Sequence, residues 1–330
     1  MIIRPDDTPI HHLDRGVERL ETRLLSDAGG LIQFGAYVAT LPPGAVSSQR
    51  HWHSAEDEFL LVLEGSATVV DDDGAHLLAP GDAACWPHGD PNAHHVCNRT
   101  DAPVRYLIVG ARVAGDQCHY PDEDSVLVNG LTRWQVTRTD GNVLREGDLP
   151  DELLNLPAVW GKPYDGTPRP HILRQGEVAA EVCGNNYPAQ WSDLGRSEDI
   201  ALSDAGGLSQ FGAFIEILRP GAQTSLRHWH EDEDEFLYVL SGQPMLIEND
   251  GPQQIGPGTC VCWQRGVANA HCLRNDTDQP VTLFIVGTRL AEDVAHYPDF
   301  DLHYTRRNGK RAFTRKDGTP YPGWPKETNR

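Results

Sequence analysis

The sequence has no apolar segment long enough to cross a membrane. No run approaches the roughly 20 residues that a bilayer-spanning helix needs. Residues 1–7 also lack the apolar centre of a secretory signal peptide. We therefore expect no membrane partner and a cytoplasmic location.

Basic runs and arginine-rich stripes are missing as well, and the formal net charge at pH 7 is −20. Such an excess of carboxylates repels the phosphate backbone of nucleic acids. Nucleic acid is therefore not an expected partner.

The cysteines do not form a disulfide framework or paired CxxC zinc knuckles. They are seven in number and scattered through apparent strands. An odd, dispersed set of this kind is typical of free thiols.

Long helical periodicity is missing from most of the chain. Short apolar runs at 59–63, 67–70 and 105–109 are instead separated by turn residues, and the 330 residues include 32 glycines and 24 prolines. This pattern is typical of an antiparallel sandwich or barrel. One weakly amphipathic segment, 16–25, predicts a helix packed outside the barrel. The length favours two domains.

An internal repeat is present. Residues 26–31 reappear at 203–208, an offset of 203 − 26 = 177, and the same offset relates Arg50-His51-Trp52-His53 to Arg227-His228-Trp229-His230. The register runs without a gap from residue 25 to 141. A proline-rich stretch follows, with a short helix expected around 152–156. We therefore predict an N-terminal barrel at 1–145, a linker at 146–195 and a C-terminal barrel at 196–330.

Each copy holds residues suited to bind a metal ion. His51 and His53 are two apart on an expected strand, so both side chains point to one face while Trp52 points away. Glu58 opens the next strand, and a hairpin could return its carboxylate to the two histidines. His94 follows Pro87 and Gly89 and supplies a fourth ligand. The second copy repeats the set as His228, His230, Glu235 and His271.

These spacings resemble the two sequence motifs of the cupin superfamily. The first motif is His-x-His, four residues, Glu, six residues, Gly. The second matches Gly81, Pro87, Gly89, His94 and Asn98, and Gln264 replaces its proline in the second copy. The resemblance implies an all-β chain of two tandem cupin barrels, each a double-stranded β-helix or jelly roll, with short peripheral helices and a metal ion inside each barrel.

Some assignments admit alternatives. His95 competes with His94, but its counterpart is Cys272 whereas that of His94 is His271, so we choose His94. Gln33 and Gln210 could bond to the metal ligands or be solvated. We expect structural roles for the remaining paired residues. Barrel packing or an interface is expected for Trp52, Trp229, Trp86 and Trp263, stabilisation of the end of each repeat for His119 and His296, and salt bridges for Arg50 and Arg227.

Three imidazoles and one carboxylate suit Fe, Mn, Ni, Co, Cu or Zn, and we expect two ions per chain with Fe(II) favoured. Cupins with this ligand set include dioxygenases, decarboxylases, isomerases and lyases. The leading hypothesis is a non-haem Fe(II) dioxygenase of a small organic acid or phenolic compound. The first alternative is a redox-neutral Mn, Ni or Zn decarboxylase, isomerase or lyase, placed second because no acid or base is evident. The second alternative is a non-enzymatic binding protein. The sequence leaves open whether the chain forms a homo-oligomer.

Overall fold

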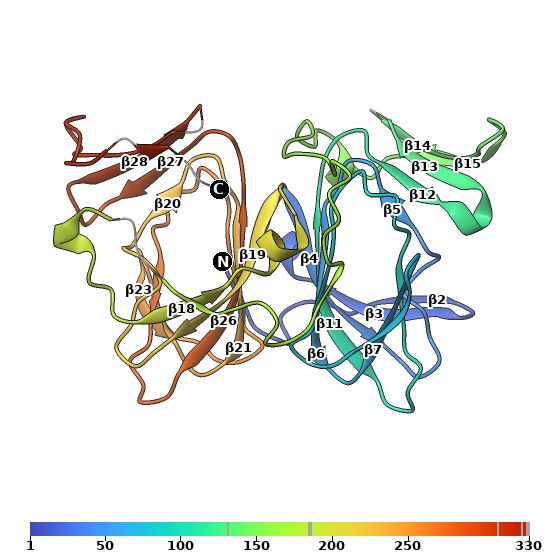
Figure 1. Ribbon diagram of the computed structural model, residues 1–330, viewed down its shortest axis with the longest axis horizontal. Coiled ribbons are helices and arrows are strands. Elements are labelled where there is room, and N and C mark those ends of the chain that lie inside the picture. Colours follow the sequence, from blue (N-terminus) through green and yellow to red (C-terminus); the bar gives the residue numbers. More distant parts are fainter. Residues whose placement is uncertain (131, 184–186, 309, 325, 328–330) are drawn as a thin grey trace.

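Two β-barrels lie side by side in the computed structural model, which describes residues 1–330 except 131, 184–186, 309, 325 and 328–330 (Figure 1). Both barrels are built from antiparallel strands joined by short turns. No helix among the described residues is both long and apolar enough to pass through a bilayer. The prediction of an all-β chain with two tandem jelly-roll barrels is confirmed.

The first barrel consists of three sheets. Its seven-stranded sheet has the order β16 (Ile172–Leu173), β9 (Ala83–Trp86), β6 (Glu58–Glu64), β11 (Val104–Ala111), β4 (Phe34–Leu41), β3 (Glu18–Leu24), β2 (His11–Arg15). A three-stranded sheet has the order β10 (His95–Cys97), β7 (Ala67–Asp71), β8 (Gly74–Leu78). A five-stranded sheet has the order β15 (Val143–Asp148), β14 (Arg133–Arg138), β13 (Ser125–Asn129), β12 (Gln117–Tyr120), β5 (Trp52–His53).

The second barrel repeats this plan. Its seven-stranded sheet has the order β1 (Ile2–Ile3), β24 (Cys260–Trp263), β21 (Glu235–Ser241), β26 (Val281–Thr288), β19 (Phe211–Leu218), β18 (Ser197–Ile200), β17 (Glu181–Val182). The other two sheets are β23 (Gly251–Gln254), β22 (Met245–Glu248), β25 (Cys272–Arg274), and β20 (Trp229–His230), β27 (Asp293–Tyr297), β28 (Leu302–Arg307), β29 (Lys310–Thr314), β30 (Lys326–Glu327).

Helices are few and short. They are α1 (Leu25–Ala28), α2 (Leu202–Gly206) and 3-10 turns at Pro121–Glu123, Asp151–Leu153 and Ala189–Trp191. The prediction of a helix at 16–25 is wrong, because most of that segment is β3, which pairs with β2 on one edge and β4 on the other. Hydrogen bonds from two neighbouring strands outweigh a weak local helical pattern. The helix expected near 152–156 corresponds to the 3-10 turn at Asp151–Leu153.

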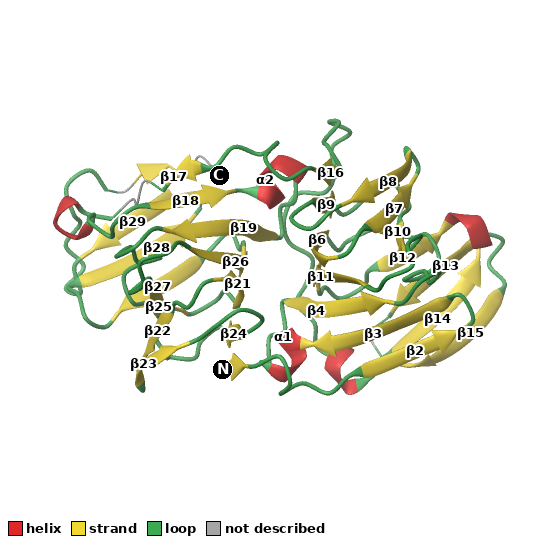
Figure 2. Cartoon of the chain, turned by 90° about the horizontal axis from the view of Figure 1, so that it is seen from below, coloured by secondary structure: helices red, strands yellow, loops and turns green. Residues whose placement is uncertain are grey.

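The two barrels pack on each other through the seven-stranded sheets (Figure 2). Phe34 and Phe211 meet there with ring centroids 6.3 Å apart, and Phe59 stacks on Phe284 at 5.3 Å. Because side chains alternate along a strand, β4 turns Phe34 to this shared core and Tyr37 to the interior of its own barrel. One face of each sheet thus joins the barrels while the other surrounds the candidate site.

The repeated Asp-Ala-Gly-Gly-Leu string lies at this contact. A Cβ built on Gly29 would lie 2.2 Å from the Cys262 sulfur, and one on Gly206 would lie 2.3 Å from the Cys85 Cβ. Only glycine permits this approach, so the string positions each short helix against the opposite barrel.

The leading strand of each copy crosses to the other barrel. β1 pairs with β24 of the second barrel, while β16, from the stretch before the second copy, pairs with β9 of the first. These pairings cross the boundaries that we place at residues 145 and 195. We keep the division into barrel, linker and barrel as a proposal, in which each barrel also contains one strand from outside its own residue range.

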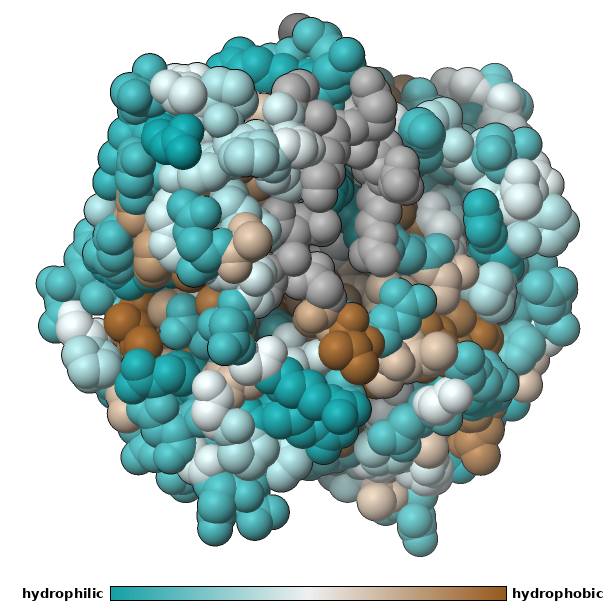
Figure 3. Space-filling model, turned by 60° about the vertical axis from the view of Figure 1, so that its left-hand side comes forward, coloured by the Kyte–Doolittle hydropathy of each residue, from teal (hydrophilic) through white to brown (hydrophobic). Residues whose placement is uncertain are grey.

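The surface carries little contiguous apolar area on the face in Figure 3, where hydrophilic residues dominate and apolar ones form small separate groups. The described part of the chain exposes few large apolar side chains, among them Val182 and Val267. Scattered residues of this kind are normal for a protein surface.

Candidate metal centres

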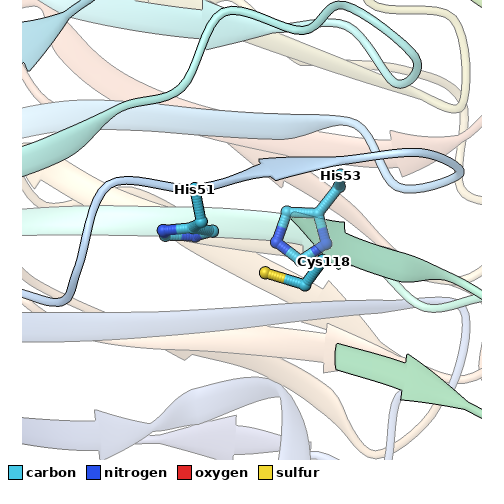
Figure 4. A group of neighbouring side chains, drawn as sticks. All are labelled: His51, His53 and Cys118. Atoms are coloured by element: carbon cyan, nitrogen blue, oxygen red, sulfur yellow. The ribbon is translucent and has the colours of Figure 1, made fainter. Parts of the chain in front are cut away.

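The four side chains predicted for the first site converge inside the first barrel. The Nε2 atom of His94 lies 2.9 Å from a Glu58 carboxylate oxygen, and those of His51 and His53 lie 3.8 Å from the same oxygen. Figure 4 shows His51 and His53 on one strand with both rings turned to the same side. An isolated bridge between His51 and His94 brings the third histidine alongside.

The second barrel has the same arrangement. The Nε2 atom of His271 lies 2.9 Å from Glu235, and that of His230 lies 3.8 Å from it. The His228 ring centroid is 4.9 Å from that of His230 and 5.2 Å from that of His271. All eight predicted ligands therefore assemble as two sets of four.

Each imidazole in the first set is held through its Nδ1 atom. The partners are the Gln49 carbonyl for His51 at 2.9 Å, the Asp116 carboxylate for His53 at 2.6 Å and the Asn92 carbonyl for His94 at 3.2 Å. A carbonyl can only accept, so Nδ1 carries the proton and Nε2 presents its lone pair to the centre.

The second set is held in the same way. Its three Nδ1 atoms bond to the Leu226 carbonyl, the Asp293 carboxylate and the Asn269 carbonyl, at 2.9, 2.6 and 3.2 Å. The residues present therefore fit a divalent transition-metal ion in both barrels.

The electrostatics of the two sites agree with this arrangement. Burial lowers the pKa of His51 to about 4 and that of His228 to about 3, so both rings are neutral at pH 7. Burial also opposes ionisation of Glu58, but the neighbouring imidazoles hold the pKa of this carboxyl well below its ordinary value. Burial acts against protonation of His230, yet the charge of Glu235 and the hydrogen bond to Asp293 raise its pKa to about 9. A cation at the centre would take the place of that proton.

His95 does not contribute to the site. Its Nδ1 atom lies 2.9 Å from the Ser48 carbonyl and its Nε2 atom lies 3.2 Å from the Cys97 sulfur. His94 is thus the histidine that the structure brings to Glu58, as the comparison of the two copies predicts.

Several residues at the centres lie outside the predicted ligand sets. Asp116 and Asp293 support a histidine each, and both are related by the 177-residue offset, which is the signal that could have identified them. Tyr37 packs against the interior core of the first barrel, and burial followed by the charge of Glu58 raises its pKa above the usual range. Its counterpart is Phe214.

Cys118 also lies outside the predicted ligand sets. Its sulfur and nitrogen atoms of His51 and His53 lie within 4.8 Å of one another, and Figure 4 shows the thiol beside His53. Ala295 replaces it in the second copy. The first site therefore has a sulfur atom near it that the second lacks.

The remaining paired residues have mainly structural roles. Arg50 bonds to Asp122 and Asp72, and Arg227 bonds to Asp299, which confirms the expected salt bridges. Trp86 stacks on His94 at 3.7 Å, Trp263 on His271 at 3.8 Å, Trp52 on His119 at 4.0 Å and Trp229 on His296 at 4.3 Å. All seven cysteines are free, as predicted.

Gln33 and Gln210 are buried at 1% and 0% exposure, so the solvated alternative is wrong for both. The Gln33 amide donates to the Asp232 carbonyl, and the Gln210 amide donates to the Ala55 carbonyl. Each glutamine therefore reaches across to the opposite barrel and binds the loop that precedes the glutamate ligand of that opposite barrel.

Comparison with known proteins adds a family match. Residues 37–110 and 214–287 each match the family model described as Cupin domain, and these segments contain all eight predicted ligands. No curated protein matches the chain in sequence.

Three solved structures illustrate the similarity. A sugar phosphate isomerase of the cupin superfamily from Silicibacter pomeroyi is 38% identical, with 44% of this chain and 94% of that chain covered and a TM-score of 0.42. The oxalate decarboxylase of Lactobacillus farciminis is 17% identical, with 88% and 87% covered and a TM-score of 0.52. Protein Ylba of E. coli is 13% identical, with 87% and 89% covered and a TM-score of 0.53. The last two share the fold over most of both chains.

Proposed function

Because this chain belongs to the cupin superfamily and carries two cupin domains in tandem, we propose that it is a metal-dependent enzyme acting on a small organic anion. In this proposal each barrel holds one divalent transition-metal ion. The ligands are His51, His53, Glu58 and His94 in the first barrel, and His228, His230, Glu235 and His271 in the second.

The observation that carries the proposal is the orientation of the six imidazoles. Every Nδ1 atom is held by a carbonyl or carboxylate, so the Nε2 atoms are left for coordination. Fe, Mn, Ni, Co, Cu and Zn all accept this donor set. Three neutral imidazoles and one carboxylate leave a divalent site with a charge near +1, which attracts an anion.

A bound divalent ion supplies a Lewis acid for a carboxylate or carbonyl oxygen. The chain itself supplies a proton donor in the first barrel. Tyr37 lies close enough to Glu58 and His53 for both charges to act on it, and its raised pKa keeps the hydroxyl protonated. This hydroxyl can donate to an oxygen of the substrate anion and can deliver a proton during the reaction.

The Tyr37 hydroxyl favours a redox-neutral decarboxylase, isomerase or lyase. Such a reaction moves protons, and a donor of this kind was not evident from the sequence. The three-histidine, one-glutamate ligand set favours a second candidate, a non-haem Fe(II) dioxygenase of an organic acid or phenolic compound, because four protein ligands leave open positions on a six-coordinate iron.

A metal-exchange assay with one substitution separates these candidates. Protein freed of metal and reloaded with Fe(II), Mn(II) or Zn(II) is given a panel of small organic acids with and without O2, and products are followed by NMR. We expect turnover without O2 that Mn(II) supports at least as well as iron. Tyr37→Phe, which introduces the residue of the second copy, should lower kcat by about 10² or more while metal content stays unchanged.

The matched control is Phe214→Tyr, which should leave metal content and first-site turnover as in the wild type. Turnover that requires both Fe(II) and O2 and is unaffected by Tyr37→Phe would establish the dioxygenase instead. Metal binding without turnover of any acid in the panel would favour a binding protein.

A further inference from the structure

A cavity of about 510 Å³ lies next to the first candidate metal site. It is bounded by β2, by residues 47–49 and by the sheet that contains β12 to β15. Two of its lining residues contact His51. The Ser48 hydroxyl lies 3.3 Å from the His51 Nδ1 atom, and the centroid of the Tyr120 ring lies 5.8 Å from that of the His51 ring. The volume falls within the roughly 300–1,000 Å³ typical of small-molecule sites.

The second copy fills the equivalent space with a tyrosine of its own. The Tyr187 ring lies 5.7 Å from Tyr297 and 5.5 Å from Phe313. By the 177-residue offset these are the counterparts of Tyr120 and Val136, both of which line the cavity. The second copy therefore shows a phenol ring seated where the first copy has a cavity.

The polar end of Tyr187 has defined partners. Its hydroxyl is hydrogen-bonded to Tyr297 and to the Leu226 backbone. The counterpart of Leu226 is Gln49, which lines the cavity together with Tyr120. The first copy thus presents the same two partners to a phenol.

The chain does not fill the first-copy cavity in the same way. Ile10, which lies 177 residues before Tyr187 but outside the gap-free repeat, is 41% exposed and lines a different cavity. Larger residues also stand in the second copy, where Tyr304 and Phe313 replace Leu127 and Val136. The space in the first barrel follows from these smaller side chains.

Two cationic side chains border the cavity. Arg15 and Arg145 both line it, and neither forms an ion pair with a described residue. Glu18 is the one acid among the described lining residues. Guanidinium groups bind carboxylates through charge-assisted, often paired hydrogen bonds.

We infer that this cavity binds a small phenolic carboxylate. Its ring lies between Tyr120 and Val136, its hydroxyl bonds to Tyr120 and the Gln49 backbone, and its carboxylate faces Arg15 and Arg145. The inference goes beyond the proposed metal chemistry and requires no metal ion. Tyr120 and Ser48 contact both the cavity and His51. The bound phenolic carboxylate therefore lies beside the residues that contact His51, which is a proposed metal ligand.

The test is calorimetric titration of the metal-free chain with 4-hydroxyphenylacetate. We expect one site per chain. Val136→Phe and Leu127→Tyr introduce the residues of the second copy, and each should abolish binding with an unchanged circular dichroism spectrum. Arg15→Gln combined with Arg145→Gln should weaken binding of 4-hydroxyphenylacetate by at least about tenfold and leave that of p-cresol, which has no carboxylate, unchanged.

The second copy supplies an independent control. Tyr187→Gly removes its tyrosine side chain and should add a second site for p-cresol that the wild type lacks. The inference is overturned if 4-hydroxyphenylacetate does not bind, or if its binding persists in both folded cavity-filling variants. Loss of p-cresol binding in the double arginine variant would show that the arginines maintain the cavity and do not recognise the carboxylate.

Discussion

The carboxylate of Asp57 in the first barrel accepts hydrogen bonds from the backbone N–H groups of Ser209 and Gln210 in the second, at 2.7 and 2.8 Å. The Gln210 side chain returns the contact, because its Oε1 atom accepts from the Asp57 N–H at 2.7 Å. Asp57 is fully buried, so these bonds have no competition from water.

The same relationship runs in the opposite direction. The Asp234 carboxylate accepts from the N–H groups of Ile32 and Gln33, and the Gln33 side chain accepts from the Asp234 N–H. Asp57 and Asp234 directly precede the glutamates proposed as metal ligands. Each barrel therefore supports the glutamate loop of the other.

This reciprocal support predicts that a substitution in the second copy affects the first metal site. Gln210→Ala should weaken metal binding at the first site, because the Asp57 N–H and the Ala55 carbonyl lose buried partners, at a cost of about 1–3 kcal/mol. The measurement is a competition titration with a chromophoric chelator in a His228→Ala background, where the second site is disabled. Gln253→Ala, at an exposed position of β23, is the control. Equal affinity in the two variants would mean that the loop does not depend on the opposite barrel.

The choice of the third histidine predicts a contrast between neighbouring substitutions. Elemental analysis of metal-loaded wild type should give close to two ions per chain. His94→Ala should reduce this to one, because the Nε2 atom 2.9 Å from Glu58 is lost. His95→Ala should retain both ions, since its ring bonds to Ser48 and Cys97. Loss of an ion in His95→Ala alone would contradict the ligand set.

The carboxylates behind His53 and His230 predict a graded effect on affinity. Asp116→Asn keeps the size of the side chain but removes the charge that orients His53 at 2.6 Å. We expect metal affinity at the first site to fall about 10–100-fold without loss of fold. Asp293→Asn should do the same at the second site, and each variant serves as the control for the other. An unchanged affinity in both would show that the carboxylates do not tune the imidazoles.

Glu216 on β19 predicts a pH dependence of stability. Burial, followed by the charge of Asp199, raises its pKa from 4.5 to about 8, while a hydrogen bond to Ser197 acts in the other direction. The protonated form thus stabilises the fold fully below pH 4.5, and this contribution is lost as the pH rises through about 8.

Denaturant unfolding of the metal-free chain across this pH range checks the prediction. Glu216→Gln should lose less stability than the wild type over the range, by about 2–4 kcal/mol. Glu123→Gln, at an exposed position, should follow the wild type. Parallel curves for wild type and Glu216→Gln would contradict the assignment.

The sequence by itself determined the fold class and the identity of the proposed ligands. Alternation along a strand places His51 and His53 on one face, and the 177-residue repeat identifies Glu58 and His94 through their counterparts. The same repeat separated His94 from His95. These features are local or are carried by self-similarity, so they can be read without coordinates.

Only the tertiary structure decided how the two copies combine. The strand at Glu18–Leu24 forms because β2 and β4 bond to its two edges, and the exchange of β1 and β16 depends on which barrel edge each one reaches. Gln33 and Tyr187 give no local signal of their partners, which lie on segments distant in the sequence. Periodicity records which face of its own element a side chain occupies, but not what the rest of the chain brings against that face. Two features depend on what packs against each face: the contact between the two barrels, and the cavity beside His51.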